Sequence, residues 1–483
     1  MTSFLHFGNR YKLQIMALVY VLAVATLIFV LFSGYGYDDP YITYRYASNL
    51  ISGEGFIYNL GERIQSTTTP LFTLLLAAAG TLWRDIPVVA NLVGALSIAA
   101  GAIFLWDLAR TWVTPLVGWA ALLLYPTFPL LLVTIGSETP LYIALILGSF
   151  ASYTRRRYTW SAGLAALTVL TRPDGWLVPL ILGLHYLITE RRPVPWPAVI
   201  TFAGLVLPWY IFSSLFFGSP IPATLAVKQQ QGSMAISQRF AQGLLTTFRP
   251  YAERWDYRIE AFYALLGLFW AGLRARRWLL FLSWGGVYFA AFALLGVSRY
   301  YWYYAPFVPL IVVLAGLGVT ALVSLLQRRF PYLSAPVLSM LFFILLIIPL
   351  LPGQFQAASR IPVQISRLKI YSALGKWLDA NLPPEASVGT LEVGIIGYYS
   401  HRTMVDFAGL IQPEVARQLR ENTTYDDAAL WAAQKYRPDT FVLQEGLFPK
   451  LETAYIAHNC QLITTFEGQT YGYQSNLMVY SCQ

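Results

Sequence analysis

The sequence predicts a polytopic, mainly α-helical membrane protein with a small α/β domain in its carboxyl-terminal part. Hydrophobic types make up 57% of the 483 residues and charged types only 12%, whereas soluble domains carry about 25% charged residues. Apolar runs recur up to residue 352, and the composition of residues 353–483 is that of a soluble domain. The 35 Gly and 28 Pro are spread through the apolar stretches, aromatics reach 16% and no repeat of 20 to 50 residues is evident, so fibrous, disordered and solenoid proteins are excluded.

Eleven apolar runs within residues 1–352 are the expected membrane spans. Several are shorter than the roughly 20 residues that cross a bilayer upright, so we expect them to extend into their flanking turns or to sit beside thinned or protein-filled regions. The runs cover residues 14–33, 87–109, 115–135, 139–153, 159–171, 175–189, 196–217, 261–273, 278–296, 305–326 and 335–351.

The positive-inside rule orients these spans in the cell membrane with a cytoplasmic amino terminus. Thirteen of the 33 Lys and Arg residues then face the cytoplasm beside two acids, and they are Arg10, Lys12, Arg110, Arg155, Arg156, Arg157, Arg191, Arg192, Arg274, Arg276, Arg277, Arg328 and Arg329. A crossing by the short run 70–82 would move eleven of them outside. We therefore expect residues 70–82 to form a re-entrant or interfacial helix on the outer face, with Thr69 as N-cap and Pro70 as first helical residue.

Charge and metal-ligand counts disfavour several other classes of protein. The net charge of +9 would fit a nucleic-acid partner, but basic residues beside apolar spans are the ordinary topogenic signal, so none is expected. Four scattered His and two Cys are too few ligands for a zinc site. The exit of the first span is a poor cleavage site, so we interpret this span as an anchor rather than a signal peptide.

Residues 353–483 are expected to form an extracytoplasmic α/β domain. A helical pattern covers residues 366–380, and alternating apolar stretches at 386–391 and 440–443 predict strands. Cys460 and Cys482 lie in an oxidising compartment in this topology, which favours a disulfide. Two buried free thiols are the equally weighted alternative.

The first outer loop, residues 34–86, begins with two adjacent acids, Asp38 and Asp39. Pro40 at the first helical position makes Asp39 a natural N-cap, and Gly53 is a suitable stop, so a surface helix is predicted over residues 39–52. Asp38 is then free to point elsewhere. A carboxylate pair at the boundary of water and lipid suits proton abstraction or cation binding, and simple capping is the alternative.

Further charged residues meet the same outer boundary. Glu138 precedes the fourth span, where a role in the first helical turn is the ordinary explanation. The three basic residues at this boundary are Arg172, Lys228 and Arg299, the last within an aromatic run. Basic groups with aromatic neighbours at headgroup depth suit a lipid-linked phosphate. Snorkelling to phospholipid headgroups explains one such residue easily and three poorly.

These motifs together resemble bacterial GT-C glycosyltransferases, integral membrane enzymes that use polyprenyl-phosphate sugars and are related to protein O-mannosyltransferases, aminoarabinose transferases and arabinofuranosyltransferases. The resemblance is carried by the acid pair with the following Tyr-Ile-x-Tyr-Arg-Tyr-Ala-x-Asn-Leu, by Gly-Glu-Gly-Phe-Ile-Tyr-Asn, and by the hydroxyl-rich run 66–71. It extends to residues 138–141, 171–175, 397–400 and 405–410. It implies a GT-C fold with about eleven transmembrane helices and juxtamembrane helices in the first outer loop.

The resemblance also implies an activity: inverting transfer of a hexose or pentose from a polyprenyl-phosphate donor to a hydroxyl of a glycan, glycolipid or protein, on the extracytoplasmic face. Asp38 would be the general base, Asp39 its orienting partner, and Glu138 a further acid near a sugar. The residues expected to bind substrate are Arg172, Lys228, Arg299, Tyr41, Arg45 and Tyr300. The motif here is Asp-Asp rather than the Asp-x-Asp of oligosaccharyltransferases, which leaves open whether Asp38 and Asp39 hold a divalent cation such as Mg²⁺ or Mn²⁺.

Two other function classes remain at this stage. A transporter or flippase for lipid-linked anions would also use basic groups and broken helices, but would concentrate charge near the bilayer midplane and show paired halves. A noncatalytic scaffold that presents the carboxyl-terminal domain would make the first-loop acids incidental.

Overall fold

The computed structural model describes residues 2–190, 193–363 and 365–482, with side chains from residue 12 onward. The helices of the first half are α1 (Thr2–Phe32), α2 (Asp38–Ile51), α3 (Pro70–Gly80), α4 (Ile86–Thr111), α5 (Pro115–Leu123), α6 (Pro129–Leu132), α7 (Thr139–Thr154), α8 (Tyr158–Thr171), η1 (Pro173–Trp176), α9 (Leu177–His185), η2 (Tyr186–Glu190) and α10 (Trp196–Phe217). They are followed by α11 (Thr224–Ser233), α12 (Phe240–Ala252), α13 (Trp255–Leu273), η3 (Arg276–Trp278), α14 (Leu279–Leu295), η4 (Tyr301–Tyr303), η5 (Ala305–Phe307), α15 (Val308–Arg329) and α16 (Ala335–Arg360).

The predicted helical membrane part is confirmed. Six helices of the described residues are long and apolar enough to cross a membrane, and shorter apolar helices such as α7 accompany them. Each expected span falls on helical segments, although the run 115–135 is divided between α5 and α6. The count of eleven crossings and their orientation stay predictions, and Arg191, Arg192 and the side chain of Arg10 lie outside the described residues.

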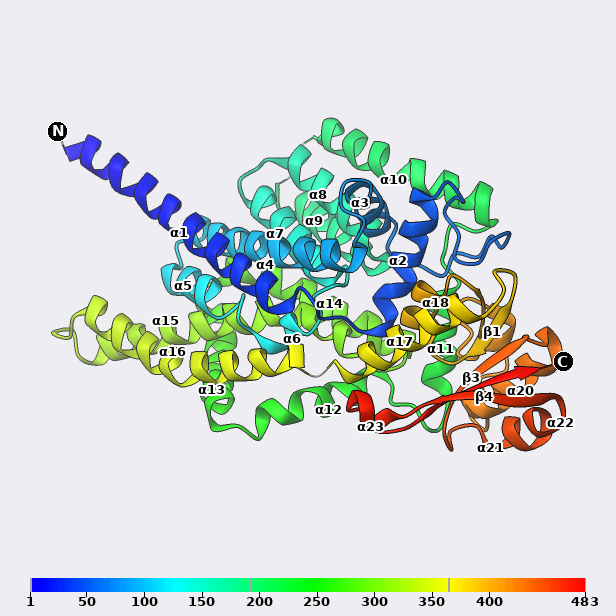
Figure 1. Ribbon diagram of the computed structural model, residues 1–483. Coiled ribbons are helices and arrows are strands. Elements are labelled where there is room, and N and C mark those ends of the chain that lie inside the picture. The colour runs from blue at the N-terminus through cyan, green and yellow to red at the C-terminus, as the bar shows by residue number, and fades with distance from the viewer. Residues whose placement is uncertain (1, 191–192, 364, 483) are drawn as a thin grey trace.

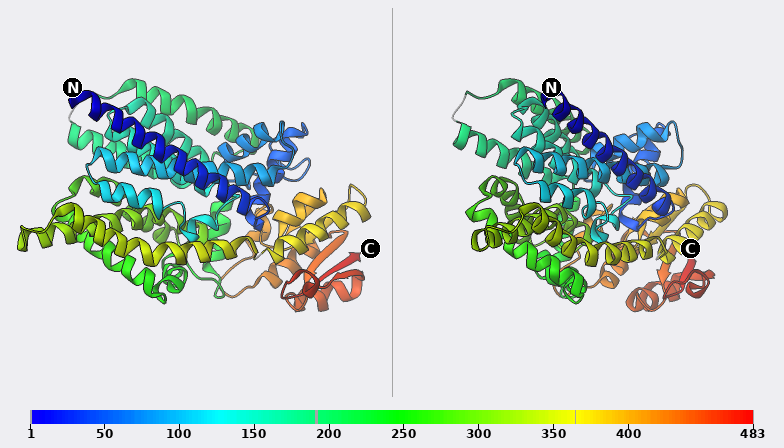
Figure 2. Two further views of the ribbon diagram at one scale, coloured as in Figure 1. Left: turned by 60° about the vertical axis from the view of Figure 1, so that its left-hand side comes forward. Right: turned by 90° about the vertical axis from the view of Figure 1, so that its left-hand side faces the viewer.

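The long helices lie side by side, and the carboxyl-terminal domain sits at one end of them (Figures 1 and 2). Close packing of α13 on α15 depends on two glycines, because a Cβ at Gly267 would overlap the carbonyl of Leu314 and one at Gly318 would overlap the carbonyl of Tyr263. Small residues that let helix backbones approach are typical of membrane helix interfaces. We call the end that carries the domain the domain end.

The first loop forms two short helices at the domain end. The predicted helix over 39–52 is present as α2, but the N-cap prediction was wrong: α2 begins at Asp38, with Tyr37 at the cap position and no side-chain cap. The carboxylate of Asp38 is instead held by a segment more than 350 residues later, which no local pattern indicates. α3 begins at Pro70 with Thr69 at its cap position, as predicted, although the Thr69 side chain makes no capping bond.

The carboxyl-terminal domain contains helices on a five-stranded sheet. Its elements are η6 (Ile361–Val363), α17 (Ser366–Asn381), β1 (Ser387–Thr390), α18 (Val393–Ser400), β2 (Thr403–Asp406), α19 (Pro413–Ala416), α20 (Tyr425–Tyr436), β3 (Thr440–Gln444), α21 (Pro449–Leu451), η7 (Glu452–Ile456), α22 (Ala457–Asn459), β4 (Cys460–Phe466), α23 (Gly468–Tyr471) and β5 (Leu477–Cys482). The strand order is β2-β1-β3-β5-β4, with β1 parallel to β2 and β3, and β5 antiparallel to both its neighbours. The predicted helix 366–380 and both predicted strands are present.

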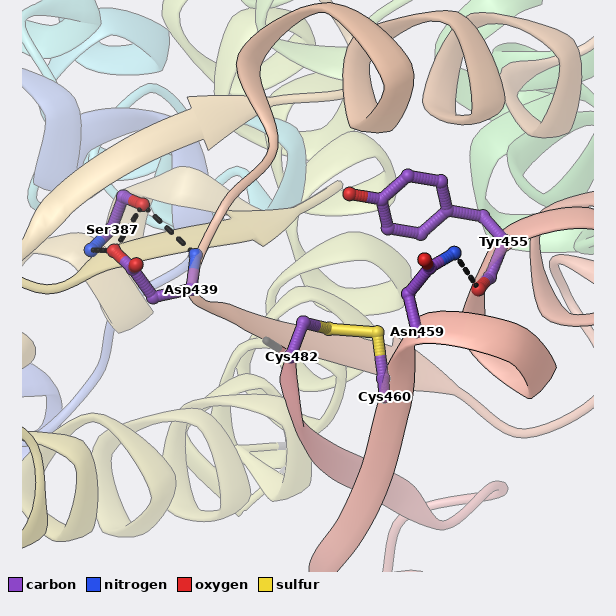
Figure 3. The surroundings of a disulfide bond; sticks show 6 residues. All are labelled: Ser387, Asp439, Tyr455, Asn459, Cys460 and Cys482. Atoms are coloured by element: carbon purple, nitrogen blue, oxygen red, sulfur yellow. Dashed lines mark hydrogen bonds between the residues drawn. A yellow bond between two sulfur atoms is a disulfide. The ribbon is translucent and has the colours of Figure 1, made fainter.

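A disulfide closes the last two strands of the sheet. Cys460 at the start of β4 and Cys482 at the end of β5 are paired in register and joined through their sulfur atoms (Figure 3). Nearby, Asp439 accepts hydrogen bonds from the backbone and hydroxyl of Ser387 at 2.8 and 2.7 Å, which ties the start of β1 to β3. Of the two alternatives left open for the cysteines, the structure has the disulfide. The predicted domain boundary at 353 falls within α16, which continues to Arg360.

Candidate active site

A cavity of about 340 Å³ opens at the domain end, between the first loop and the ends of several long helices. One part of its wall is polar and is formed by Asp39, Thr43, Ser66, Thr67, Thr68, Thr69, Ser137, Glu138, Arg172, Asp174 and Lys228. The other part is apolar and includes Trp176, Leu177, Ile221, Leu225, Phe292, Leu295 and Val297. The cavity therefore has the two-sided character that a ligand with a charged head and a hydrocarbon tail requires.

Asp39 and Lys228 form the first pair of opposite charges on the polar wall. Asp39 lies in the first turn of α2 with its side chain 36% exposed, and its Oδ2 lies 3.5 Å from Nζ of Lys228. Lys228, on α11, is buried, and its ammonium lies 3.7 Å from the ring centre of Tyr300. The Tyr300 hydroxyl donates to Oε1 of Gln231, one helical turn further along α11. The aromatic ring thus holds the lysine beside Asp39.

Arg172 forms the second charged group together with two acids. Its Nε donates to Oδ1 of Asp174 at 3.0 Å, and its Nη1 lies 3.5 Å from Oε1 of Glu138. The guanidinium also lies 5.0 and 5.4 Å from the ring centres of Tyr142 and Tyr303. Arg172 follows the last residue of α8, and Glu138 immediately precedes α7. Two helix ends therefore fix this group in a buried position where a planar cation can meet an anionic ligand.

Three threonine hydroxyls cluster on the wall beside Asp39. Oγ1 of Thr43 lies 3.2 Å from Oγ1 of both Thr67 and Thr69, which are 3.0 Å from each other. Oγ of the neighbouring Ser66 is buried without a hydrogen-bond partner among the described residues. Each hydroxyl can both donate and accept, so this wall suits a polyhydroxylated or phosphorylated ligand. The hydroxyl-rich run was visible in the sequence, but its role was not assigned there.

Asp38 faces away from the cavity and binds the amino terminus of α18. Its Oδ2 accepts from the backbone N–H of Gly394 at 2.9 Å, and its Oδ1 accepts from that of Ile395 at 2.8 Å. Gly394 is required for this approach, because a Cβ there would overlap the carbonyl of Asp38. A carboxylate at a helix amino terminus satisfies N–H groups that have no partner within the helix.

The surroundings of Asp38 make its carboxyl easier to protonate. Burial raises the pKa of Asp38, and the nearby carboxyl of Glu392 raises it further, against the two backbone N–H groups, which lower it. Burial likewise raises the pKa of Glu392, opposed by the guanidinium of Arg367, which lies 3.4 Å from its Oε1. Asp38 and Glu392 thus form a carboxyl pair at the junction between α2 and the carboxyl-terminal domain.

Arg45 completes this junction about two turns further along α2. It is buried, and it donates to the carbonyls of Gly397 and Arg402 at 2.8 and 2.6 Å, at the carboxyl end of α18. Its guanidinium also lies 4.4 Å from the ring centre of Tyr58, whose hydroxyl donates to the carbonyl of Val393. The junction is therefore built by charged side chains and backbone groups that are satisfied on both sides.

The structure brings together four of the charged residues singled out in the sequence and separates the others from them. Asp39, Glu138, Arg172 and Lys228 line the cavity, and Tyr300 supports Lys228. Asp38, Tyr41, Arg45 and Arg299 do not line it: Tyr41 packs against Tyr398 and Tyr399, and Arg299 points to Oε1 of Gln238 at 3.3 Å. Asp174, Trp302 and Tyr303 line the cavity but were not singled out individually.

The acids on the cavity do not fit a divalent cation held by protein groups alone. Asp39 and Glu138 each lie 3.5 Å from a basic partner. Among the described residues, no group of three or more His, Cys, Asp or Glu side chains gathers as a metal site. Hard divalent cations take six or more oxygen ligands, often including waters or substrate phosphates, so the described side chains alone do not complete such a site.

Comparison with known proteins gives matches for the whole chain and for its parts. Residues 360–480 match the model of a domain of unknown function, DUF8728. Over 249 residues the chain is 27% identical to terminal β-(1→2)-arabinofuranosyltransferase of Mycobacterium tuberculosis H37Rv; the match covers 44% of this chain and 38% of that protein. The chain thus spans about two fifths of the length of that relative.

Solved structures match over nearly the entire chain. ArnT from Cupriavidus metallidurans, bound to undecaprenyl phosphate, aligns with a TM-score of 0.59 and 15% identity over 96% of this chain and 97% of that one. The oligosaccharyltransferase of Archaeoglobus fulgidus aligns with a TM-score of 0.58 and 13% identity over 88% and 69%. Mycobacterial arabinofuranosyltransferase AftD aligns with a TM-score of 0.54 and 17% identity over 96% and 40%. The chain therefore has the fold of the GT-C superfamily, which confirms the resemblance predicted from its first-loop motifs.

Proposed function

We propose that this protein is a glycosyltransferase that moves a sugar from a polyprenyl-phosphate donor to an acceptor hydroxyl on the extracytoplasmic face of the cell membrane. The observation that carries the proposal is the cavity at the domain end, whose polar wall holds two buried basic groups and whose other wall is apolar. The relatives support it, because three of them are glycosyltransferases by name and one is bound to undecaprenyl phosphate.

The phosphate of the donor would lie between Arg172 and Lys228. Both cations are buried. Arg172 is paired with Asp174 through Nε at 3.0 Å, but its Nη1 reaches Glu138 only at 3.5 Å, and the ammonium of Lys228 reaches Asp39 only at 3.5 Å. The hydrocarbon tail would follow the apolar wall past Leu177 and Leu225. As the bond between the anomeric carbon and the phosphate oxygen breaks, the phosphate gains charge, and preorganised cations stabilise that charge more than they stabilise the ground state.

We assign the general base to Asp39 rather than to Asp38, the residue expected from the sequence. Asp39 lines the cavity and is partly exposed, whereas both carboxylate oxygens of Asp38 are occupied by backbone N–H groups of α18. In the proposed step the acceptor oxygen bonds to the anomeric carbon, its proton passes to Asp39, and the polyprenyl phosphate leaves with the electron pair of the broken bond. Asp38 is then a positioning residue that fixes the first turn of α2, and Glu138 a second acid that orients a sugar hydroxyl and Arg172.

The test is transfer by purified protein in proteoliposomes that contain labelled polyprenyl-phosphate pentoses and hexoses together with envelope glycolipid acceptors. Asp39→Asn should reduce transfer by about 100-fold or more, as expected for loss of a general base, with an unchanged melting temperature. Glu54→Gln is the matched control, because Glu54 is an exposed acid of the same loop. Movement of donor lipid across the membrane without transfer to any acceptor, or full transfer by Asp39→Asn, would overturn the proposal.

A further inference from the structure

A second cavity, of about 800 Å³, lies at the other end of the long helices. Thr154, the last residue of α7, lines it, whereas Glu138 just before α7 lines the first cavity. Likewise α14 begins at Leu279 in the second cavity and ends at Leu295 in the first. Helices of 16 and 17 residues separate the two sites by about 25 Å at 1.5 Å per residue, close to the thickness of the hydrocarbon layer.

Three arginines line this cavity and leave it with an excess of positive charge. Arg156 lies 3.7 Å from Glu190, the one acid on the wall among the described residues. Arg276 donates to the carbonyl of Gly272, and within the described part of the chain no acidic side chain lies within ion-pair distance of Arg276 or Arg277. Two guanidinium groups therefore remain for a ligand, and the planar guanidinium is well matched to phosphate oxygens.

The remaining wall is mixed, with the polar side chains of Thr111, Thr154, His185 and Ser283 among apolar ones that include Ile181, Leu184, Leu279 and Leu280. Ile181 is buried at the inner wall, while Leu184 and Leu279 at the rim are 50% and 41% exposed. Exposed apolar side chains continue from the rim along η2 at Leu187 and Ile188. A helix surface of this kind faces hydrocarbon in a membrane protein, so these residues suit an acyl chain that continues from the cavity.

The positive-inside rule alone does not account for the arginines that line this cavity. The positive-inside rule places basic residues on one side of the membrane, and Arg328 and Arg329 satisfy it at the end of α15 without lining a described cavity. Arg276 and Arg277, by contrast, border a cavity whose wall also includes exposed apolar residues, Leu184 and Leu279. We propose that this cavity is a binding site for the phosphate headgroup of an anionic membrane phospholipid, with an acyl chain lying along Leu184, separate from the catalytic cavity.

Native mass spectrometry of the detergent-purified full-length protein, titrated with phosphatidylglycerol or phosphatidylcholine, tests the site. We expect one phosphatidylglycerol to bind more tightly than phosphatidylcholine. The double variant Arg276→Gln/Arg277→Gln should weaken this binding by about tenfold or more, since it removes charge-assisted hydrogen bonds to phosphate. Arg328→Gln/Arg329→Gln removes the same charge at the same end of the helices and should leave the binding within about twofold of the wild type.

A second variant tests the same site in case the double arginine variant fails to fold. Ser283→Trp fills the cavity while all three arginines are retained, and it should also displace the lipid, because Ser283 is an exposed residue on the wall. Equal losses in the two arginine pairs, or full binding by Ser283→Trp, would overturn the proposal. So would complete displacement of phosphatidylglycerol by an equal concentration of inorganic phosphate, which would indicate a soluble ligand. None of these measurements depends on glycosyl transfer.

Discussion

Asp38 and Arg45, seven residues apart on α2, hold the two ends of α18 in the carboxyl-terminal domain. The carboxylate meets the amino end of α18, where the helix carries partial positive charge, and the guanidinium meets its carboxyl end, where the charge is partially negative. Both contacts are buried. The carboxyl-terminal domain is therefore fixed to the helix that carries Asp39, and its position determines where Asp39 lies in the cavity.

Removal of Asp38 should loosen this junction. Asp38→Ala leaves the N–H groups of Gly394 and Ile395 buried without this partner, and an unsatisfied buried donor costs about 1–3 kcal/mol. We expect faster proteolysis of residues 360–480 in the purified protein and a lower melting temperature, with reduced transfer as a consequence. Glu54 is an exposed acid two residues after Ser52, the C-cap of α2. Its replacement, Glu54→Gln, should leave the protease protection of residues 360–480 unchanged. Wild-type protection in Asp38→Ala would show that the junction does not depend on this carboxylate.

The same junction should weaken as the pH rises. Burial raises the pKa of both Asp38 and Glu392 when the carboxyl-terminal domain is docked on α2. At pH values between the ordinary and the raised pKa, the protein with the domain docked therefore binds more protons than the protein with the domain detached. The stabilisation is fully present below the ordinary carboxyl pKa and is lost as the pH rises through the raised values. Protease protection of the domain, measured across this range, should therefore fall with increasing pH in the wild type. In Glu392→Gln, protection should depend less steeply on pH. An identical pH dependence in the variant and the wild type would contradict a contribution of Glu392 to the titration.

The two arginines predicted to bind phosphate should behave differently when replaced by lysine. Arg172→Lys loses the contact to Asp174 and the packing against Tyr142 and Tyr303. A lysine ammonium does not reproduce the planar, multiply donating guanidinium group. We expect its kcat/KM for the lipid donor to fall by about 10- to 100-fold, since loss of a charged contact costs about 1.5–3 kcal/mol. Arg299→Lys should change kcat/KM by less than about twofold, because Arg299 lies off the cavity. Equal effects in the two variants would exclude Arg172 from the donor site.

The disulfide should stabilise the carboxyl-terminal domain. Cys460 and Cys482 are separated by 22 residues, and closure of a loop of this length stabilises a folded state by about 3 kcal/mol in the chain-entropy model. The variant Cys460→Ser/Cys482→Ser should show a lower melting temperature for the domain, and reductant should lower the wild type to the same value. Labelling of cells with a maleimide before and after reduction reports the bond directly. Thiols that react fully without reductant would contradict it.

The sequence predicts the helical part and the position of the site well, because both depend on local signals. Apolar runs of membrane length identify the long helices, and charged residues at their outer boundaries identify Asp39, Glu138, Arg172 and Lys228 as neighbours before any contact is known. These residues come together because each lies in or beside a segment that joins long helices at the domain end, and the positive-inside rule predicts that these segments share one side of the membrane.

The sequence does not predict which acid of the pair faces the cavity. Adjacent residues on a helix point about 100° apart, so either Asp38 or Asp39 could have faced the site. The choice is made by α18, whose backbone N–H groups take the Asp38 carboxylate across more than 350 residues of chain. Arg45 was assigned to substrate for the same reason: its charge is visible in the sequence, but its carbonyl partners at Gly397 and Arg402 belong to another domain.

The strand order of the sheet has a consequence for biogenesis. β5 follows β3 and β4 in the chain, yet it lies between them, so β4 has no partner strand in the sheet until β5 has been made, whereas β1, β2 and β3 pair without it. α18 packs beside this sheet and supplies the partners of Asp38 and Arg45. The β4 edge of the sheet would therefore be completed among the last events of synthesis, and a chain interrupted before residue 477 would carry β4 unpaired although α18, which contacts Asp38, is already made.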